Sequence, residues 1–445
     1  MKTIELLCRG FCPLLAFLLA QTVSGDNGQL SLRDAVERAQ QQDPWIQGSL
    51  YRQQALEAQS TTAAALPDPM ISAGFANLPT NTFNFDQEPM TQFRVGVSQA
   101  LPRGDSRALQ QQQLLLMGDQ HPYQRADRRA RVAAEVSGLW LDAWRASQTI
   151  KLIEQDTDLF IQLVDIAESS YVNSIKGARQ QDLVHAQLEL TRLEDRLVSL
   201  QEQQEIALSR LNQWLLNADA TNFGSISYVL PQALPEISPM APQLASSEQT
   251  PSPQSLANIL REHPALKNVD QRLAASSTAI KLAEQNYRPE WRLNASYGYR
   301  DDDPIGRSRA DFFSFGVSFD LPLFTSNRQD QQVISATATT ESVRTERALL
   351  LRKMVAEMTT LHARLQRLNQ RQTLYHTRLL DDMTAQVEAT MEAYTNDDGD
   401  FAEAVRAKIG ELNTQIDSLN IAVDRQKTIA QLNYFFASSN NLEGK

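Results

Sequence analysis

The sequence predicts a mainly α-helical protein with a small membrane β-barrel, in which long antiparallel coiled-coil helices form an α-barrel and each chain supplies four strands. Three observations lead to this fold class: a duplicated plan, two pairs of alternating strands, and coiled-coil seams that follow each strand pair. Four strands are too few to close a barrel, since the smallest transmembrane barrels have about eight. The chain is therefore expected to assemble with identical copies, three of which would together supply 12 strands.

Composition narrows the protein class before any motif is considered. The 445 residues carry a net charge of −11, which excludes nucleic acid as an expected partner. The two cysteines, Cys8 and Cys12, lie next to or within the apolar run 11–20, and we interpret residues 1–25 as a cleaved secretory signal. The exported remainder has no thiol for a disulfide, a catalytic thiolate or a zinc site. Because no later stretch is apolar for about 18 residues, any membrane crossing would use strands.

The chain consists of two copies of one unit. Three pairs of prolines are separated by 220 residues, namely Pro44 and Pro264, Pro69 and Pro289, and Pro102 and Pro322. Farther along, Tyr171 and Tyr394 are separated by 223 residues. We therefore expect a first structural repeat over 26–252 and a second over 253–445, each with a short helix, a strand pair and a long helix hairpin. The first ends in a Pro-rich segment, about 217–252, which is expected at the waist, where the short helices meet. The second ends in a C-terminal tail.

Each repeat contains two segments in which apolar and polar residues alternate, as in amphipathic strands. The strand pairs are expected over 70–101 and 291–321, and the polar loops 78–91 and 301–311 join their strands. The last strand has apolar residues at every second position: Phe313, Phe315, Val317, Phe319 and Leu321. Arg, Asn and Asp on the other side suit a water-filled lumen, so the apolar side is expected to face lipid.

Long helices with a coiled-coil seam follow each strand pair. Apolar residues recur at alternating spacings of four and three from Val132 to Tyr171, and only Thr157 interrupts them chemically. One long helix is expected from Pro102 to Gly177 and another from Pro322 to Asn396, each about 110 Å long. The remaining helical pieces are about half that length, so two of them stacked end to end would match one long helix: 30–66, 182–216, 253–288 and 403–436.

This plan resembles the TolC-like outer-membrane efflux proteins, or outer membrane factors, over essentially the whole mature chain. Segments 67–70, 77–79 and 97–102 are similar to the heavy-metal efflux branch of that family. The resemblance implies a trimeric conduit in the bacterial outer membrane that extends into the periplasm and passes metal cations or drugs without chemistry. It also implies a periplasmic adaptor (membrane fusion) protein, an inner-membrane pump and outer-membrane lipid as partners, and no cofactor.

The resemblance also implies functional residues at the periplasmic tip. The expected adaptor-docking residues are Tyr171, Gly177, Asp182, Leu183, Tyr394 and Gly399. Family members narrow the tunnel with a ring of acidic side chains, for which the candidates here are Asp397, Asp398, Asp400 and Glu403. Arg406 stands where another acid is common. Such a ring would attract cations and repel anions, whereas the alternative interpretation of 397–400 is a solvated turn.

Other classes of function have less support from the residues. No nucleophile, acid–base pair or phosphate-binding loop stands out, so no enzyme is expected. Asp182 and His185 could share a metal ion from one helix face, but a solvated face is the commoner reason for such a pair, and no metal site is expected. The competing class is a periplasmic coiled-coil adaptor of an export complex, which would show one helical hairpin between small β-domains. Two hairpins and two strand pairs favour the conduit.

Overall fold

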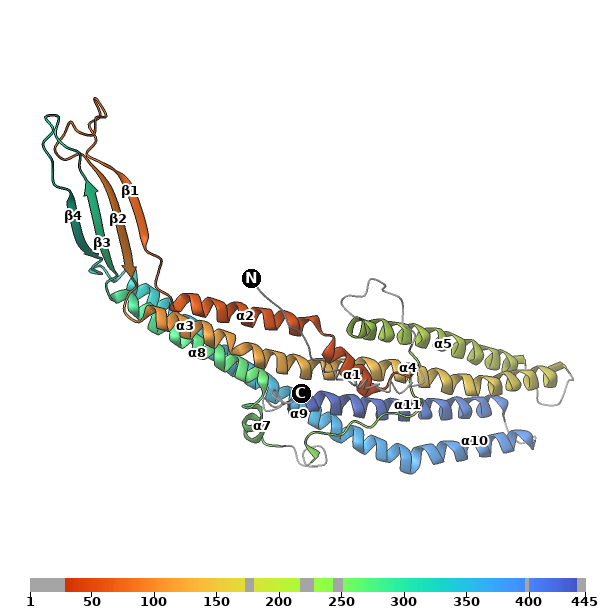
Figure 1. The fold of residues 1–445 in the computed structure, drawn as a ribbon. Helices are drawn as coiled ribbons and strands as arrows, with labels where there is room; N and C mark the ends of the chain where they lie inside the picture. The colour runs from red at the N-terminus through yellow and green to blue at the C-terminus, as the bar shows by residue number, and fades with distance from the viewer. Residues whose placement is uncertain (1–28, 173–179, 217–227, 243–250, 397–399, 438–445) are drawn as a thin grey trace, which may run out of the picture.

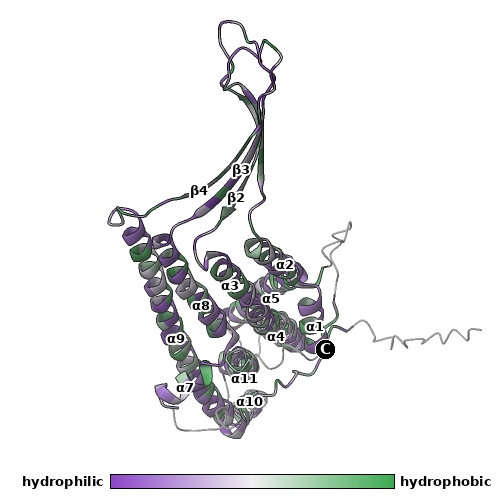
Figure 2. Cartoon of the chain, turned by 60° about the vertical axis from the view of Figure 1, so that its left-hand side comes forward, coloured by the Kyte–Doolittle hydropathy of each residue, from purple (hydrophilic) through white to green (hydrophobic). Residues whose placement is uncertain are grey.

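The molecule is elongated, with a small sheet at one end and helices that run from it to the opposite end (Figure 1). The computed structural model describes residues 29–172, 180–216, 228–242, 251–396 and 400–437. The interpreted signal, 1–25, lies outside them. A second view, coloured by hydropathy, shows the strands extending away from the helical body (Figure 2).

The same order of elements occurs in both halves of the chain. The first half contains α1 (Leu32–Gln41), α2 (Pro44–Ala64), β1 (Met70–Ala76), β2 (Gln92–Leu101), α3 (Ser106–Gly118), α4 (Gln120–Val172) and α5 (Gln180–Leu215). The second contains α7 (Pro253–Leu260), α8 (Pro264–Glu284), the 3-10 turn η1 (Gln285–Tyr287), β3 (Trp291–Tyr299), β4 (Phe312–Phe319), α9 (Gln329–Leu374), the π-helical turn η2 (Tyr375–Leu379), α10 (Leu380–Thr395) and α11 (Phe401–Tyr434). The predicted mainly α-helical class with four strands per chain is confirmed.

Three of the short helices begin at a proline that follows a capping side chain. Asp43 and His263 each accept a hydrogen bond from the backbone N–H two residues on, at the starts of α2 and α8. Ser252 does the same for the N–H of Ser255 at the start of α7. Proline suits the first helical position because the N–H it lacks would be unpaired there. As a consequence, the pieces predicted over 30–66 and 253–288 are each two helices rather than one.

The first long helix is interrupted, which corrects the prediction of one helix from Pro102 to Gly177. Helix α3 ends at Gly118 and α4 begins at Gln120, with Asp119 between them. Pro122 lies in the first turn of α4 and has no N–H to donate to the carbonyl of residue 118. The missing hydrogen bond accounts for the end of α3, and a proline is tolerated in the first turn that follows.

The second long helix, predicted from Pro322 to Asn396, starts at Gln329 and contains a π-helical turn. The buried seam residues Met354 and Met358 lie 222 positions after Val132 and Val136, their counterparts in α4. The two tyrosines of the hairpins, in contrast, lie 223 positions apart. The second helix therefore holds one additional residue, which the wider π turn η2 accommodates without turning the seam away from α11.

The four strands form one antiparallel sheet in the order β1-β2-β3-β4. The central pair joins the two halves of the chain, with Val97 opposite Ala295. At the helix end of the sheet, Arg103 donates a hydrogen bond of 2.8 Å to the carbonyl of Arg288 and forms an ion pair with Asp320. This contact fixes the start of the first long helix against the strands of the second half.

The core consists of apolar clusters spaced along the helices, and the largest lies at the waist. There α4 contributes Trp140 and Trp144, which the predicted seam does not include. Their indole N–H groups donate to the carbonyls of Leu30 at 3.0 Å and Pro231 at 2.8 Å, so they hold two connecting segments against the helix. None of the described helices is both long and apolar enough to cross a membrane.

Candidate functional site

One face of the sheet is apolar across all four strands. The register places Phe75 opposite Phe93, Val95 opposite Tyr297, and Ala295 opposite Phe315. Since side chains on directly opposed residues share a face, these positions form one continuous surface. Several of its side chains are largely exposed in the single chain, including Phe313 at 74 % and Phe315 at 68 %. The predicted assignment of the apolar face in β4 agrees with this register.

The opposite face of the sheet is polar. Ser98 lies opposite Asn294, and Arg292 lies opposite Ser318. The amide of Asn294 donates to the hydroxyl of Ser318 at 3.5 Å. The sheet therefore separates an apolar surface from a surface that water can wet.

The two outer strands pair on one side only. Among the described residues, β1 pairs only with β2 and β4 pairs only with β3. Each outer edge carries backbone N–H and C=O groups that are available to another strand. The strands β1 and β4 run in opposite directions, so a β4 edge placed beside the β1 edge of another copy would continue the antiparallel order.

The ends of the helical hairpins lie opposite the sheet (Figure 1). At this tip, Asp400 caps α11, because its Oδ1 accepts a hydrogen bond of 3.2 Å from the N–H of Ala402. Glu403 is exposed in the first turn of the same helix. Negative side chains here interact favourably with the helix dipole. Both residues thus stabilise the helix start and leave negative charge at the tip, and Arg406 is also exposed.

Two of the predicted docking residues belong to the apolar core of the tip. The ring of Tyr394 lies 5.5 Å from that of Phe401 in an edge-to-face contact. Leu183 on α5 packs against the same cluster and is partly buried. The buried members of the cluster come from α4, α5 and α11: Ile153, Phe160, Ala186, Leu193, Phe401, Val405, Leu412 and Ile416. Tyr394 and Leu183 thus pack against one core that the two hairpins of a single chain share.

The other predicted site residues lie at the ends of the described segments or beyond them. Asp397, Asp398, Gly399 and Gly177 lie outside the described residues. Tyr171 falls in the last turn of α4 and Asp182 in the first turn of α5. The acidic ring and the docking role stay predictions.

A charged network links three helices near the tip and has no counterpart in the sequence predictions. Lys408 on α11 lies 2.8 Å from Glu411 and 3.3 Å from Asp156 on α4. Glu411 also accepts a hydrogen bond of 3.0 Å from Thr384 on α10. Burial lowers the pKa of Lys408, but the hydrogen bond to Glu411 and the nearby Asp156 together outweigh it and leave the pKa raised. The network therefore holds a positive charge between the hairpins.

Only the pair of Lys408 and Glu411 can be recognised from the sequence. Lys408 and Glu411 are three residues apart on one helix, a spacing that places them side by side. Asp156 comes from the other hairpin, and nothing in the spacing of residues reports which helices pack together.

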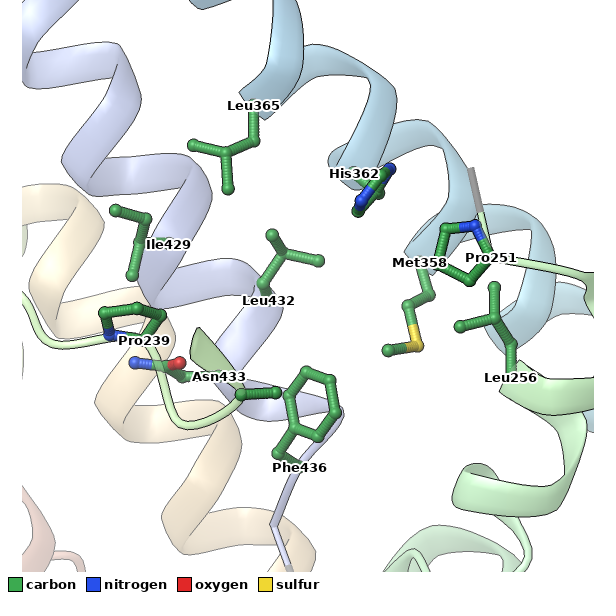
Figure 3. A pocket seen from close by; sticks show the side chains of 11 residues that line it. Pro239, Pro251, Leu256, Met358, His362, Leu365, Ile429, Leu432, Asn433 and Phe436 are labelled. Carbon is green, nitrogen blue, oxygen red and sulfur yellow. The ribbon is translucent and has the colours of Figure 1, made fainter. Parts of the chain in front are cut away.

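An apolar pocket lies at the waist between α7, α9, α11 and the connecting segments (Figure 3). Leu256, Met358 and Phe436 line it, and its volume is about 20 Å³. A single water molecule needs roughly 10–15 Å³ by this measure. This pocket is too small for a transported solute.

Comparison with known proteins agrees with this geometry. No protein-family model and no curated protein sequence matches the chain. Among solved structures, the transmembrane channel CusC is 15 % identical with a TM-score of 0.72, over 93 % of both chains. The outer membrane protein VceC of Vibrio cholerae is 14 % identical with a TM-score of 0.70, over 92 % of this chain and 96 % of its own. The CmeC outer membrane channel of Campylobacter jejuni is 14 % identical with a TM-score of 0.72, over 91 % of this chain and 85 % of its own.

The chain thus has the fold of outer membrane channels. In particular, it has the TolC-like architecture of paired helical hairpins and a four-stranded sheet, as the sequence resemblance predicts.

Proposed function

We propose that the protein is a trimeric outer-membrane exit duct that serves a tripartite efflux system. The observation that carries the proposal is the amphipathic sheet with two open edges, since such a sheet is incomplete in a single chain. In lipid, each unpaired backbone group costs several kcal/mol, and a closed barrel removes this cost. Three chains would give 12 strands with the apolar face outward.

The helical part would continue this barrel into the periplasm. Helix α4 alone has 53 residues, or about 80 Å of helix. The hairpins end far from the sheet, where a periplasmic adaptor protein and an inner-membrane pump would dock. A place in the outer membrane agrees with the similar structures, which are outer membrane proteins and channels.

Transport through this duct would be passive, without chemistry by the chain. Selection would depend on the shape and charge of the assembled lumen and on the pump. An acidic ring from Asp397, Asp398, Asp400 and Glu403 would favour cations at the tip. Metal ions and drugs both stay candidate cargoes.

The competing proposal of a periplasmic coiled-coil adaptor has less support. An adaptor would contain one helical hairpin between small β-domains. This chain contains two, α4 with α5 and α10 with α11, and a single sheet shared by both halves.

Membrane fractionation and single-channel recording test the proposal. We expect the mature protein in the outer membrane, as a trimer in mild detergent that forms channels in planar bilayers. Recovery as a soluble periplasmic monomer would contradict the duct.

Charge neutralisation at the tip tests the acidic ring separately. The variant with Asp397→Asn, Asp398→Asn, Asp400→Asn and Glu403→Gln should lower cation selectivity, and asparagine at 400 retains the helix cap. Asp381→Asn with Asp382→Asn, exposed on α10, is the matched control. If the wild type, the fourfold variant and the control are equally selective for cations, the acidic-ring proposal is wrong, whereas the duct proposal is unaffected.

A further inference from the structure

Two exposed linkers lie at the helix end of the sheet, one beside each open edge. Residues 65–69 lead from α2 into β1, and residues 320–328 lead from β4 into α9. Because β1 starts and β4 ends at this level, both linkers lie at the same height on opposite sides of the sheet. In a ring of copies, the 320–328 linker of one chain would face the 65–69 linker of the next.

The linker after β4 exposes large apolar side chains. Phe324 is 89 % exposed and Leu323 is 68 % exposed. The segment is nevertheless ordered by backbone hydrogen bonds, since the carbonyl of Thr325 accepts from Arg328 at 3.1 Å and from Asp330 at 3.0 Å. An ordered segment loses little conformational entropy on binding, so it is suited to docking.

This linker is also longer than its counterpart in the first half of the chain. Between the matching prolines and the following helices, Pro102 precedes α3 by four residues and Pro322 precedes α9 by seven. At the 220-residue offset of the matching prolines, Phe324 corresponds to Gly104, which has no side chain. The exposed ring is therefore specific to the edge that carries β4.

The linker before β1 offers a fixed apolar position in return. Leu66 is 49 % exposed. Two prolines, Pro67 and Pro69, restrict the backbone that follows it. The side-chain amide of Gln99 donates a hydrogen bond of 2.8 Å to the carbonyl of Pro67 and ties the linker to β2.

The two linkers also carry opposite charges without ion-pair partners. Asp68 and Arg328 are exposed, and neither forms an ion pair with another described residue. Other charges at this junction are paired, as in Arg103 with Asp320 and Arg288 with Asp105. An acid on one edge and a base on the other are complementary between copies and not within one chain.

We infer that the 320–328 linker of each copy docks on the 65–69 linker of its neighbour, with Phe324 packed against Leu66 and Arg328 paired with Asp68. The partner is thus a second copy of this chain, and the inference rests on the proposed trimer. The ion pairs place this level at the barrel rim, where a neighbouring copy can remove the exposed phenylalanine ring from water. The contact seals each seam directly beneath the strands.

Disulfide trapping tests the contact, because the described residues contain no cysteine. A chain with Leu66→Cys and Phe324→Cys should give covalent oligomers up to trimers on oxidation, since a disulfide needs Cα atoms within about 7 Å. The control carries Leu66→Cys and Leu374→Cys, which is also exposed but lies far along α9. It should stay uncrosslinked.

A charge exchange provides an independent test. Asp68→Arg and Arg328→Asp should each lower the melting midpoint of the detergent-purified trimer by on the order of 3 °C. The double exchange should restore it. If both single exchanges and the double exchange melt at the wild-type temperature, and the cysteine pair gives no crosslink, the inference is wrong.

Two further outcomes separate the causes of failure. If the wild-type protein is monomeric in detergent, the proposed trimer is wrong. If the wild type is a trimer but the variant with Leu66→Cys and Phe324→Cys gives no crosslink, only this contact is wrong. Strong quenching of a Phe324→Trp variant by brominated lipid would assign the ring to the bilayer and also overturn the contact.

Discussion

At the residue scale, a chain of hydrogen bonds that starts at His263 connects three helices at the waist. His263 caps α8 by accepting from the N–H of Ala265 at 3.1 Å, and its other nitrogen lies 3.0 Å from the carbonyl of Tyr434 on α11. The Tyr434 hydroxyl donates to Asp127 on α4 at 2.7 Å, and Asp127 pairs with Arg131. This arrangement uses neutral imidazole, with one nitrogen accepting and the other donating. Burial lowers the pKa of His263 despite the hydrogen bond to Tyr434.

The lowered pKa of His263 predicts an acid-sensitive waist. Since the folded pKa lies below the unfolded value of about 6.5, the stabilisation is complete above pH 6.5 and is lost as the pH falls through the folded pKa. Thermal melts between pH 8 and 5 should show a steeper loss for the wild type than for His263→Asn, which keeps a capping side chain. Parallel pH profiles for the two proteins would contradict this assignment.

The charged network at the tip predicts a second residue-scale effect. Lys408→Met leaves Asp156 and Glu411 close together without their shared cation, and breaking a buried ion pair costs up to about 3–5 kcal/mol. Hydrogen exchange in α10 and α11 should accelerate strongly. Arg406→Ala, on the same helix but exposed, is the control and should change exchange little. Equal protection in the two variants would mean that the network does not hold the hairpins together.

At the element scale, the strands were predictable and the helix interruptions were only partly so. Period-2 alternation placed all four strands within a few residues, because each has one apolar and one polar face. Pro122 marks the break before α4, since a proline is tolerated in the first turn of a helix and disfavoured in its interior. The π turn leaves a one-residue shift in the seam: the alternating spacing of four and three from Met354 leads to position 382, whereas the apolar residue is Met383.

The tip residues show where sequence reasoning stops. The hairpin turns are visible from Tyr171 and Gly177 in the first repeat and from Tyr394 and Gly399, at a shorter spacing, in the second. The same pattern cannot distinguish a side chain that packs inside, as Tyr394 and Leu183 do, from one that docks a partner. That distinction depends on which helices are neighbours, which the seam spacing does not encode.

Removal of one residue tests the origin of the π turn. Deletion of His376 should convert η2 to regular helix and preserve packing on both sides, so the melting midpoint should change by a few degrees at most. Deletion of Ala363 from the regular part of α9 should rotate the seam by about 100° and destabilise the hairpin severely. If both deletions are equally damaging, η2 does more than accommodate an additional residue.

At the scale of the whole molecule, assembly depends on which face of the sheet meets lipid. Phe315→Asp places a charge on the apolar face, and Ser314→Asp places the same charge on the polar face of the same strand. At the bilayer centre Arg or Lys costs about 2–4 kcal/mol and an acidic residue costs less, and the trimer would carry the charge three times. Recovery of trimers from membranes should fall sharply for Phe315→Asp and little for Ser314→Asp. Equal recovery would mean that the lipid and lumen faces are reversed.

The two outer edges of the sheet differ from each other, and this has a genetic consequence. Each chain would offer β4 to one neighbour and β1 to the other, so a chain with a damaged β4 could still attach through β1. Such a chain would occupy a place in the ring and leave one seam open. Co-expressed in equal amounts with the normal chain, it would leave only about one ring in eight wholly intact, because every position must be filled by a sound copy. Alleles that damage one edge should therefore be dominant, whereas alleles that prevent folding should be recessive.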